Sequence, residues 1–154
     1  MVDSQRGVKH EAMVDSWIDV ELEKLKLEDK RLLKGSKQLL RRLSEAPQDS
    51  IPAACRSASE IKAAYRFFSN ERMSAAPILT SHRLSTLTRM SYYPVVLIPQ
   101  DTTVLNFSSQ LEREDTGPTT QDNSQSMYCH LSIALTPEKV CLGVLAVTRW
   151  HREQ

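Results

Sequence analysis

Basic side chains are the residues of this sequence whose type and clustering point most clearly to a chemical task. The 154-residue chain has a net charge of +1, but residues 30–90 hold twelve basic and four acidic side chains, a net of +8. Residues 1–29 and 91–154 have net charges of −4 and −3. Positive charge concentrated in this way predicts a polyanionic partner. On charge alone, the alternative of a solvated helix face rich in Lys and Arg stays open.

The basic residues begin in a segment that predicts an amphipathic helix. Its buried stripe at helical spacing consists of Leu32, Leu33, Ser36, Leu39, Leu40 and Leu43. Asp29 is suited to cap this helix by accepting from its free backbone N–H groups. Lys30, Arg31 and Lys34 lie in the first turns, where those N–H groups also favour anions. These three side chains are candidate phosphate contacts, and the family resemblance described below favours that role.

Three further helices complete a helical bundle predicted over residues 15–91, after a mobile tail at 1–14. The first is a short helix predicted by an apolar pattern that begins with Trp17 and Ile18 and includes Val20, Leu22 and Leu25. A loop is expected over 47–52. A capping box at residues 57–60 starts the next helix, whose apolar face is expected to hold Ile61, Ala64, Tyr65 and Phe68. Ser74 is expected to cap the last helix, which contains His82. Tyr65 and Phe68 are therefore predicted to be core residues rather than base-stacking ones.

Residues 92–154 have the patterns of β-structure. Strands are predicted at 95–98 with a continuation at 102–107, and then at 127–135 and 140–147. Pro99 predicts a bulge or an unpaired edge, residues 108–126 a long loop, and residues 136–139 a tight turn. The predicted fold class is α+β, a helical bundle followed by a three-stranded antiparallel meander.

Several functional classes find no support in the sequence. No run of about 18 apolar residues predicts a membrane span. The polar start at residues 1–11 does not look like a secretory signal, so a cytoplasmic location is expected. Cys55, Cys129 and Cys141 are widely spaced without a CxxC pair, which predicts inert thiols rather than a zinc site or a disulfide framework.

An ordered set of short segments resembles one family, the bacterial cut-and-paste insertion-sequence transposases of the DDE type. The set consists of residues 27–32, 50–52, 63–70, His82, Arg89, 100–103, 130–132 and 142–143. Its most specific parts are Tyr65-Arg66-Phe67 with Asn70, followed by Asp101-Thr102-Thr103. The resemblance covers roughly residues 15–150 and corresponds to the N-terminal part of these enzymes.

The resemblance implies that residues 15–91 bind the double-stranded DNA of transposon ends. It also implies that residues 92–154 form the first three strands of an RNase H-like catalytic domain. Asp101 matches the first catalytic carboxylate, which in the family helps to hold two Mg²⁺ ions. The family's second Asp and its Glu lie further along the chain than this sequence reaches. This chain alone is therefore expected to bind no metal and to be catalytically incomplete.

The remaining residues of the resemblance have both structural and functional interpretations. Arg66 is a candidate phosphate contact, and Asn70 is a helix-end residue that could also read a base edge. His82 and Arg89 match family positions and are assigned to the DNA interface on that ground. The family usually has Gly at position 28 and a basic residue at position 35, where this chain has Glu28 and Gly35.

Two other classes of function stay open. A free-standing metal-dependent nuclease would need further acids beside Asp101, whereas Glu112, Glu114, Asp115 and Asp122 fall in the predicted loop. A protein-interaction or regulatory module would use the exposed edge of the short sheet, which invites strand pairing and self-association. A non-functional transposase remnant has the same sequence features.

Overall fold

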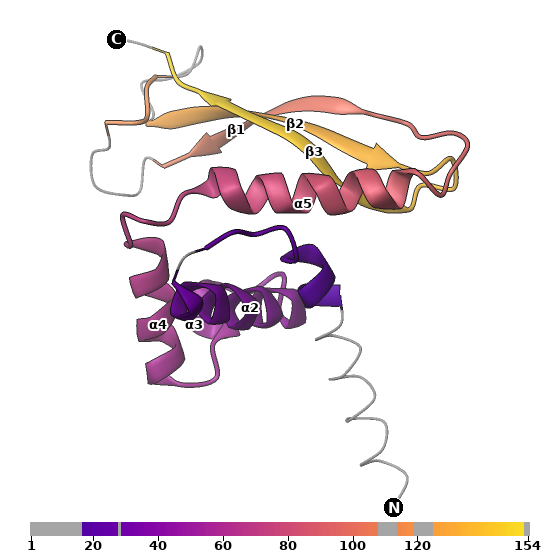
Figure 1. Ribbon diagram of the computed structural model, residues 1–154. Helices are drawn as coiled ribbons and strands as arrows, with labels where there is room; N and C mark the ends of the chain where they lie inside the picture. Colours follow the sequence, from indigo (N-terminus) through magenta and orange to yellow (C-terminus); the bar gives the residue numbers. More distant parts are fainter. Residues whose placement is uncertain (1–16, 28, 108–113, 119–124, 153–154) are drawn as a thin grey trace, which may run out of the picture. The chain divides into compact units, whose positions relative to one another are not determined.

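The computed structural model describes residues 17–27, 29–107, 114–118 and 125–152. The predicted tail at 1–14 lies outside them. The chain divides into two compact units, residues 1–82 and 83–154, and helix α5 (Ala75–Met90) begins in the first and ends in the second. The sequence pattern instead suggested a domain boundary near Ser91, which stays a prediction. The predicted α+β class is confirmed, because helices precede a three-stranded antiparallel sheet (Figure 1).

Helix α2 (Lys30–Glu45) begins where its cap predicts. The Oδ1 atom of Asp29 accepts a 2.8 Å hydrogen bond from the backbone N–H of Arg31. Leu39 and Ser36 are buried on the inner side of the helix. The Ser36 hydroxyl donates to the Leu32 carbonyl oxygen at 2.9 Å, so this polar residue in the stripe is satisfied locally.

The loop expected over 47–52 is wrong in its last part, where α3 (Ile51–Ala54) forms one short turn of helix. Pro52 lies at the start of that turn, and its fixed φ suits the first turn of a helix. Helix α4 (Ala58–Phe68) begins at the predicted capping box, where Ser57 Oγ accepts from the Glu60 N–H at 3.2 Å. The Glu60 carboxylate in turn accepts from the Arg56 N–H at 2.8 Å.

Two apolar clusters form the core of the first unit. One is built on the buried residues Ile18, Leu22 and Leu25. The other is built on Leu39, Ala64 and Phe67 from α2 and α4. Ile78 of α5 packs against both clusters, so the start of α5 joins them into one core.

The predicted apolar face of α4 is wrong by part of a turn. Tyr65 and Phe68 are 53% and 55% exposed, whereas Phe67 is 9% exposed and packs with Ala64 against α2. Both arcs of the helix carry apolar residues, and contact with Leu39 selects the arc that holds Ala64 and Phe67. The two exposed aromatic side chains are therefore not core residues.

The second unit contains a sheet in the order β1 (Gln100–Asn106), β2 (Ser126–Leu135), β3 (Cys141–Trp150). Both strand pairs are antiparallel, which confirms the predicted meander. The turn predicted at 136–139 closes with a 2.9 Å hydrogen bond from the Lys139 N–H to the Thr136 carbonyl oxygen. Lys139 completes it in the left-handed region, with φ of 67°.

The strand predicted at 95–98 is wrong, since only an isolated bridge between Leu97 and Leu135 forms there. The register nevertheless continues through Pro99 without a bulge, because Leu97 faces Leu135 and Gln100 faces Ser132. The Pro99 carbonyl oxygen accepts from the Ile133 N–H at 3.1 Å, but Pro has no N–H to return the bond. The regular ladder therefore begins only at Gln100, and β1 is an edge strand.

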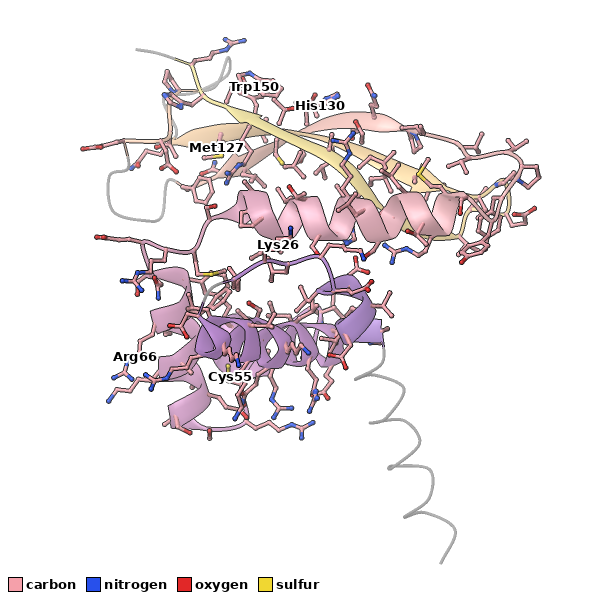
Figure 2. All side chains as sticks on the ribbon, in the orientation of Figure 1. Lys26, Cys55, Arg66, Met127, His130 and Trp150 are labelled. Carbon is pink, nitrogen blue, oxygen red and sulfur yellow. The ribbon has the colours of Figure 1, made fainter. Side chains whose placement is uncertain are left out.

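Residues 83–90 of α5 belong to the second unit and lie along one face of its sheet (Figure 1). Arg89 attaches this helix to β3 by donating from Nε to the Leu142 carbonyl oxygen at 2.5 Å. Successive side chains of a strand point to opposite faces, so Met127 and His130 of β2 lie on different faces of the sheet (Figure 2).

Candidate nucleic-acid interface

A ridge of cations runs along the solvent side of α2. It consists of Lys30, Lys34, Lys37 and Arg41, whose spacing of four, three and four residues keeps them on one side of a helix. Buried Leu39 lies on the opposite side. Lys37 pairs with Asp19, with Nζ and Oδ1 2.5 Å apart. Of these four residues, the sequence predicts Lys30 and Lys34 as candidate contacts, and the helix places Lys37 and Arg41 on the same side.

The first turns of α2 hold the cations that protein groups do not neutralise. Lys30, Arg31 and Lys34 are exposed. Among the described residues, none of these three side chains forms an ion pair. Their positive charge and the N-terminal end of the helix dipole favour a bound anion in the same place. Contact of these residues with DNA stays a prediction.

A bidentate ion pair between Arg42 and Glu60, called the clasp below, joins α4 to α2. Arg42 donates from Nε and Nη2 to the two carboxylate oxygens of Glu60, each at 2.9 Å. Gln38 Nε2 also donates to Glu60, at 3.0 Å. The hydrogen bonds from Arg42 and from the Arg56 backbone lower the pKa of Glu60 from 4.5 to about 2. The same pairing raises the pKa of Arg42. Arg42 therefore holds the framework, and the clasp fixes the position of α4 on α2.

Arg66 and Asn70 lie at the end of α4 and differ in their surroundings. Arg66 is exposed, and its side chain projects away from the helix (Figure 2). The Asn70 Oδ1 atom accepts from the backbone N–H of Arg72 at 2.9 Å and so closes the turn after α4. Arg66 is placed where a phosphate could reach it, whereas the oxygen of Asn70 is used within the turn.

His82 and Arg89, also predicted as DNA contacts, are engaged with protein groups. The Nδ1 atom of His82 makes a short contact with a carboxylate oxygen of Glu21. Ser81 reinforces this by donating from Oγ to the Glu21 carbonyl oxygen at 2.8 Å. Besides its bond to β3, Arg89 donates from Nη2 to Thr86 Oγ1 at 3.0 Å. Contact of His82 or Arg89 with DNA would have to compete with these interactions.

Asp101 lies in edge strand β1, where it faces Leu131 of β2 and is exposed. Its Oδ1 atom accepts from the Thr102 N–H at 2.8 Å, and the Thr102 hydroxyl is 2.7 Å from Nδ1 of His130. Within the part of the chain that the structure describes, no three His, Cys, Asp or Glu side chains gather to hold a metal ion. A role of Asp101 in holding a metal ion stays a prediction.

Two of the four loop acids named in the nuclease hypothesis lie within the described residues. Glu114 is exposed, and it lies with Asp115 in a turn. Glu112 and Asp122 lie outside the described residues.

Residues 14–73 match the family model described as transposase DNA-binding. The chain therefore carries an N-terminal transposase DNA-binding region, and that region contains α2, α3, α4 and the cationic ridge. No curated protein matches the chain. None of the helices in the described ranges is long and apolar enough to cross a membrane.

Proposed function

We propose that this chain binds the double-stranded DNA of transposon ends sequence-specifically through its N-terminal unit. The observation that carries the proposal is the start of α2, where Lys30, Arg31 and Lys34 lie exposed inside the transposase DNA-binding region. Phosphate contacts position a protein on DNA and supply most of its salt-dependent affinity. Arg66 of α4 provides a further contact, held in place by the Arg42–Glu60 clasp.

The salt dependence of binding tests this proposal. Four phosphate contacts, from Lys30, Arg31, Lys34 and Arg66, correspond to a log–log slope of affinity against salt of about −3 to −4. Fluorescence anisotropy with a labelled duplex measures that slope. Replacing Arg31 and Lys34 together by Ala should make the slope less negative by about 2 units. A slope near zero for the unaltered chain would refute phosphate-driven binding.

A matched control removes the same charge away from the ridge. Lys24 and Lys26 are exposed lysines before α2, and Lys24 lies 3.3 Å from the carboxylate of Glu23. Replacing both by Ala should change the slope by less than the Arg31 and Lys34 double replacement does. Equal changes would mean that net charge, rather than the start of α2, drives the interaction.

We propose further that the sheet is the beginning of an RNase H-like domain and that the chain does not catalyse transposition by itself. Support comes from the antiparallel order β1-β2-β3 and from the place of Asp101 in β1. Two-ion phosphoryl chemistry needs several oxygen ligands around each Mg²⁺. Asp101 supplies one carboxylate, and that carboxylate accepts from Thr102.

The alternative of a regulatory module that self-associates through the sheet edge has one observation in its favour. All seven residues of β1 are exposed, and β1 has β2 on one side only. An exposed strand edge can pair with another chain. However, the outward N–H of Thr102 already donates to Asp101, which removes one donor from that edge. DNA binding therefore stays the better supported function.

A further inference from the structure

The solvent side of α4 carries aromatic surface that the core does not use. One row of exposed residues is Ala58, Lys62, Tyr65 and Ser69, spaced by four, three and four residues. Phe68 lies between this row and the buried side that holds Ala64 and Phe67. Tyr65 and Phe68 are 53% and 55% exposed. Side chains of this size usually bury most of their area. Two of them exposed within one turn form a surface suited to a partner.

This aromatic surface is ordered by the core beneath it. The Phe68 ring meets the buried Phe67 ring edge to face, with centroids 5.7 Å apart and planes at 82°. Tyr65 borders a shallow hollow that is also lined by Ile61 and Ala58. The Phe68 ring is therefore held against the core, and binding would require little reordering of this side chain.

The charges around the rings select the kind of partner. Lys62 and Arg66 are exposed beside Tyr65. Neither of these two cations has an ion-pair partner in the part of the chain that is described. Glu60 is the sole acid of α4, and it is engaged by Arg42. Aromatic surface beside unneutralised cations complements a polyanion that also offers apolar groups.

We propose that α4 lies in the major groove of A·T-containing DNA, with Tyr65 and Phe68 against thymine methyl groups. This inference rests on the proposed DNA binding and names the bases that would be read. The major groove is about 12 Å wide and admits a helix, and the thymine methyl is the apolar group that base edges present there. Eleven residues of α4 span about 16 Å, enough to follow the groove across several base pairs.

The placement of the cations agrees with this docking. With Tyr65 and Phe68 facing the bases, helical spacing puts Lys62 and Arg66 together on one flank of α4, where they reach toward the phosphates along one edge of the groove. Phosphate contacts then set the position of the helix, while the apolar contacts distinguish thymine from the other bases.

The test replaces thymine by uracil, which removes the methyl group and leaves the charge and the pairing unchanged. The probe is a duplex that the unaltered chain selects from a random pool, made once with thymine and once with uracil. A buried methyl group contributes about as much as a buried methylene. The uracil duplex should therefore bind about four-fold more weakly for one contacted methyl and about fifteen-fold for two.

Three variants connect that discrimination to α4. Phe68→Ala and Tyr65→Ala should bring the thymine-to-uracil affinity ratio toward 1 while keeping the salt slope. Phe68→Leu should keep part of the ratio, because an apolar side chain remains. Tyr92→Ala is the matched control, since Tyr92 is 77% exposed and lies outside α4, and it should leave the ratio unchanged.

The outcomes separate this inference from the function on which it rests. Salt-dependent binding with equal affinity for both duplexes would overturn the thymine contacts and leave DNA binding intact, and it would favour a protein partner for the aromatic surface. An undiminished ratio in both Phe68→Ala and Tyr65→Ala would also overturn the inference. Absence of salt-dependent binding in the unaltered chain would overturn both proposals.

Discussion

Replacing two neighbouring phenylalanines separately by alanine should have very different effects on stability. Phe67 is 9% exposed and packs with Leu39 and Ala64, whereas Phe68 is 55% exposed. Removing a buried Phe side chain costs about 3–5 kcal/mol, because the lost burial adds to the cavity left behind. Phe68→Ala loses mainly the edge-to-face contact with Phe67 and some partly covered area, about 1 kcal/mol.

Urea unfolding followed by tryptophan fluorescence measures this difference. The chain has two tryptophans, of which Trp17 lies in the first unit and Trp150 in the second. Trp150 stacks on Tyr128, with ring centroids 5.5 Å apart. A Trp150→Phe background keeps an aromatic ring there and leaves Trp17 as the reporter of the unit that contains both phenylalanines. With a slope of about 1–2 kcal/mol per molar urea for a small unit, Phe67→Ala should lower the midpoint by roughly 2 M or more.

The Phe68→Ala variant is the comparison for Phe67→Ala. Phe68→Ala should lower the midpoint by less than about 1 M. Equal shifts for the two variants, or a larger shift for Phe68→Ala, would mean that α4 turns its other face to the core. In that case the aromatic surface proposed to contact thymine would not exist.

Three further predictions follow from single contacts. Glu60→Gln should make the free energy of unfolding decrease less steeply as the pH falls. Because folding lowers the pKa of Glu60 from 4.5 to about 2, its stabilising contribution is present above pH 4.5 and is lost as the pH falls toward 2; urea midpoints across that window measure it, and parallel curves for the two proteins would contradict it. Gly35→Ala should stabilise the first unit by about 1 kcal/mol through helix propensity, since the added Cβ would lie 3.6 Å from the Phe67 ring, an ordinary contact; a lower melting temperature would show that the site is too tight. Asp101→Asn should leave DNA affinity unchanged, and neither form should nick supercoiled plasmid in Mg²⁺; metal-dependent nicking that the substitution abolishes would reveal an active site completed by another chain.

Much of the candidate interface could be predicted from local sequence signals. Asp29 and Ser57 each begin a helix by accepting from an N–H two or three residues ahead, which depends only on nearby atoms. The clustering of cations at the start of α2 is also a local property, because helical spacing alone puts Lys30 and Lys34 on one side of the helix. The turn at 136–139 likewise follows from its own residues.

Contacts between residues far apart in the sequence decided which candidate side chains are engaged by protein groups and where the sheet begins. The clasp joins Arg42 to Glu60 across 18 residues, and Glu21 meets His82 across 61. No local pattern reports such pairs, so the sequence offered no sign that Arg42, His82 or Arg89 would be engaged by protein groups. The apolar run at 95–98 has strand propensity, but a strand also needs a partner for its ladder, and Pro99 has no N–H to give.

What the sequence by itself determined is therefore that helices precede an antiparallel meander, where α2 and α4 begin, and the concentration of positive charge on α2. What only the tertiary structure decided is which arc of α4 is buried. Tyr65 and Phe68 on one arc, and Ala64 and Phe67 on the other, are similarly apolar, so helical periodicity alone could not choose between them. Packing against Leu39 and the Arg42–Glu60 clasp rotates α4 so that Phe67 is buried and Phe68 is exposed. The physical reason is that burial depends on the surface a neighbouring helix presents, which is set by residues far away in the chain.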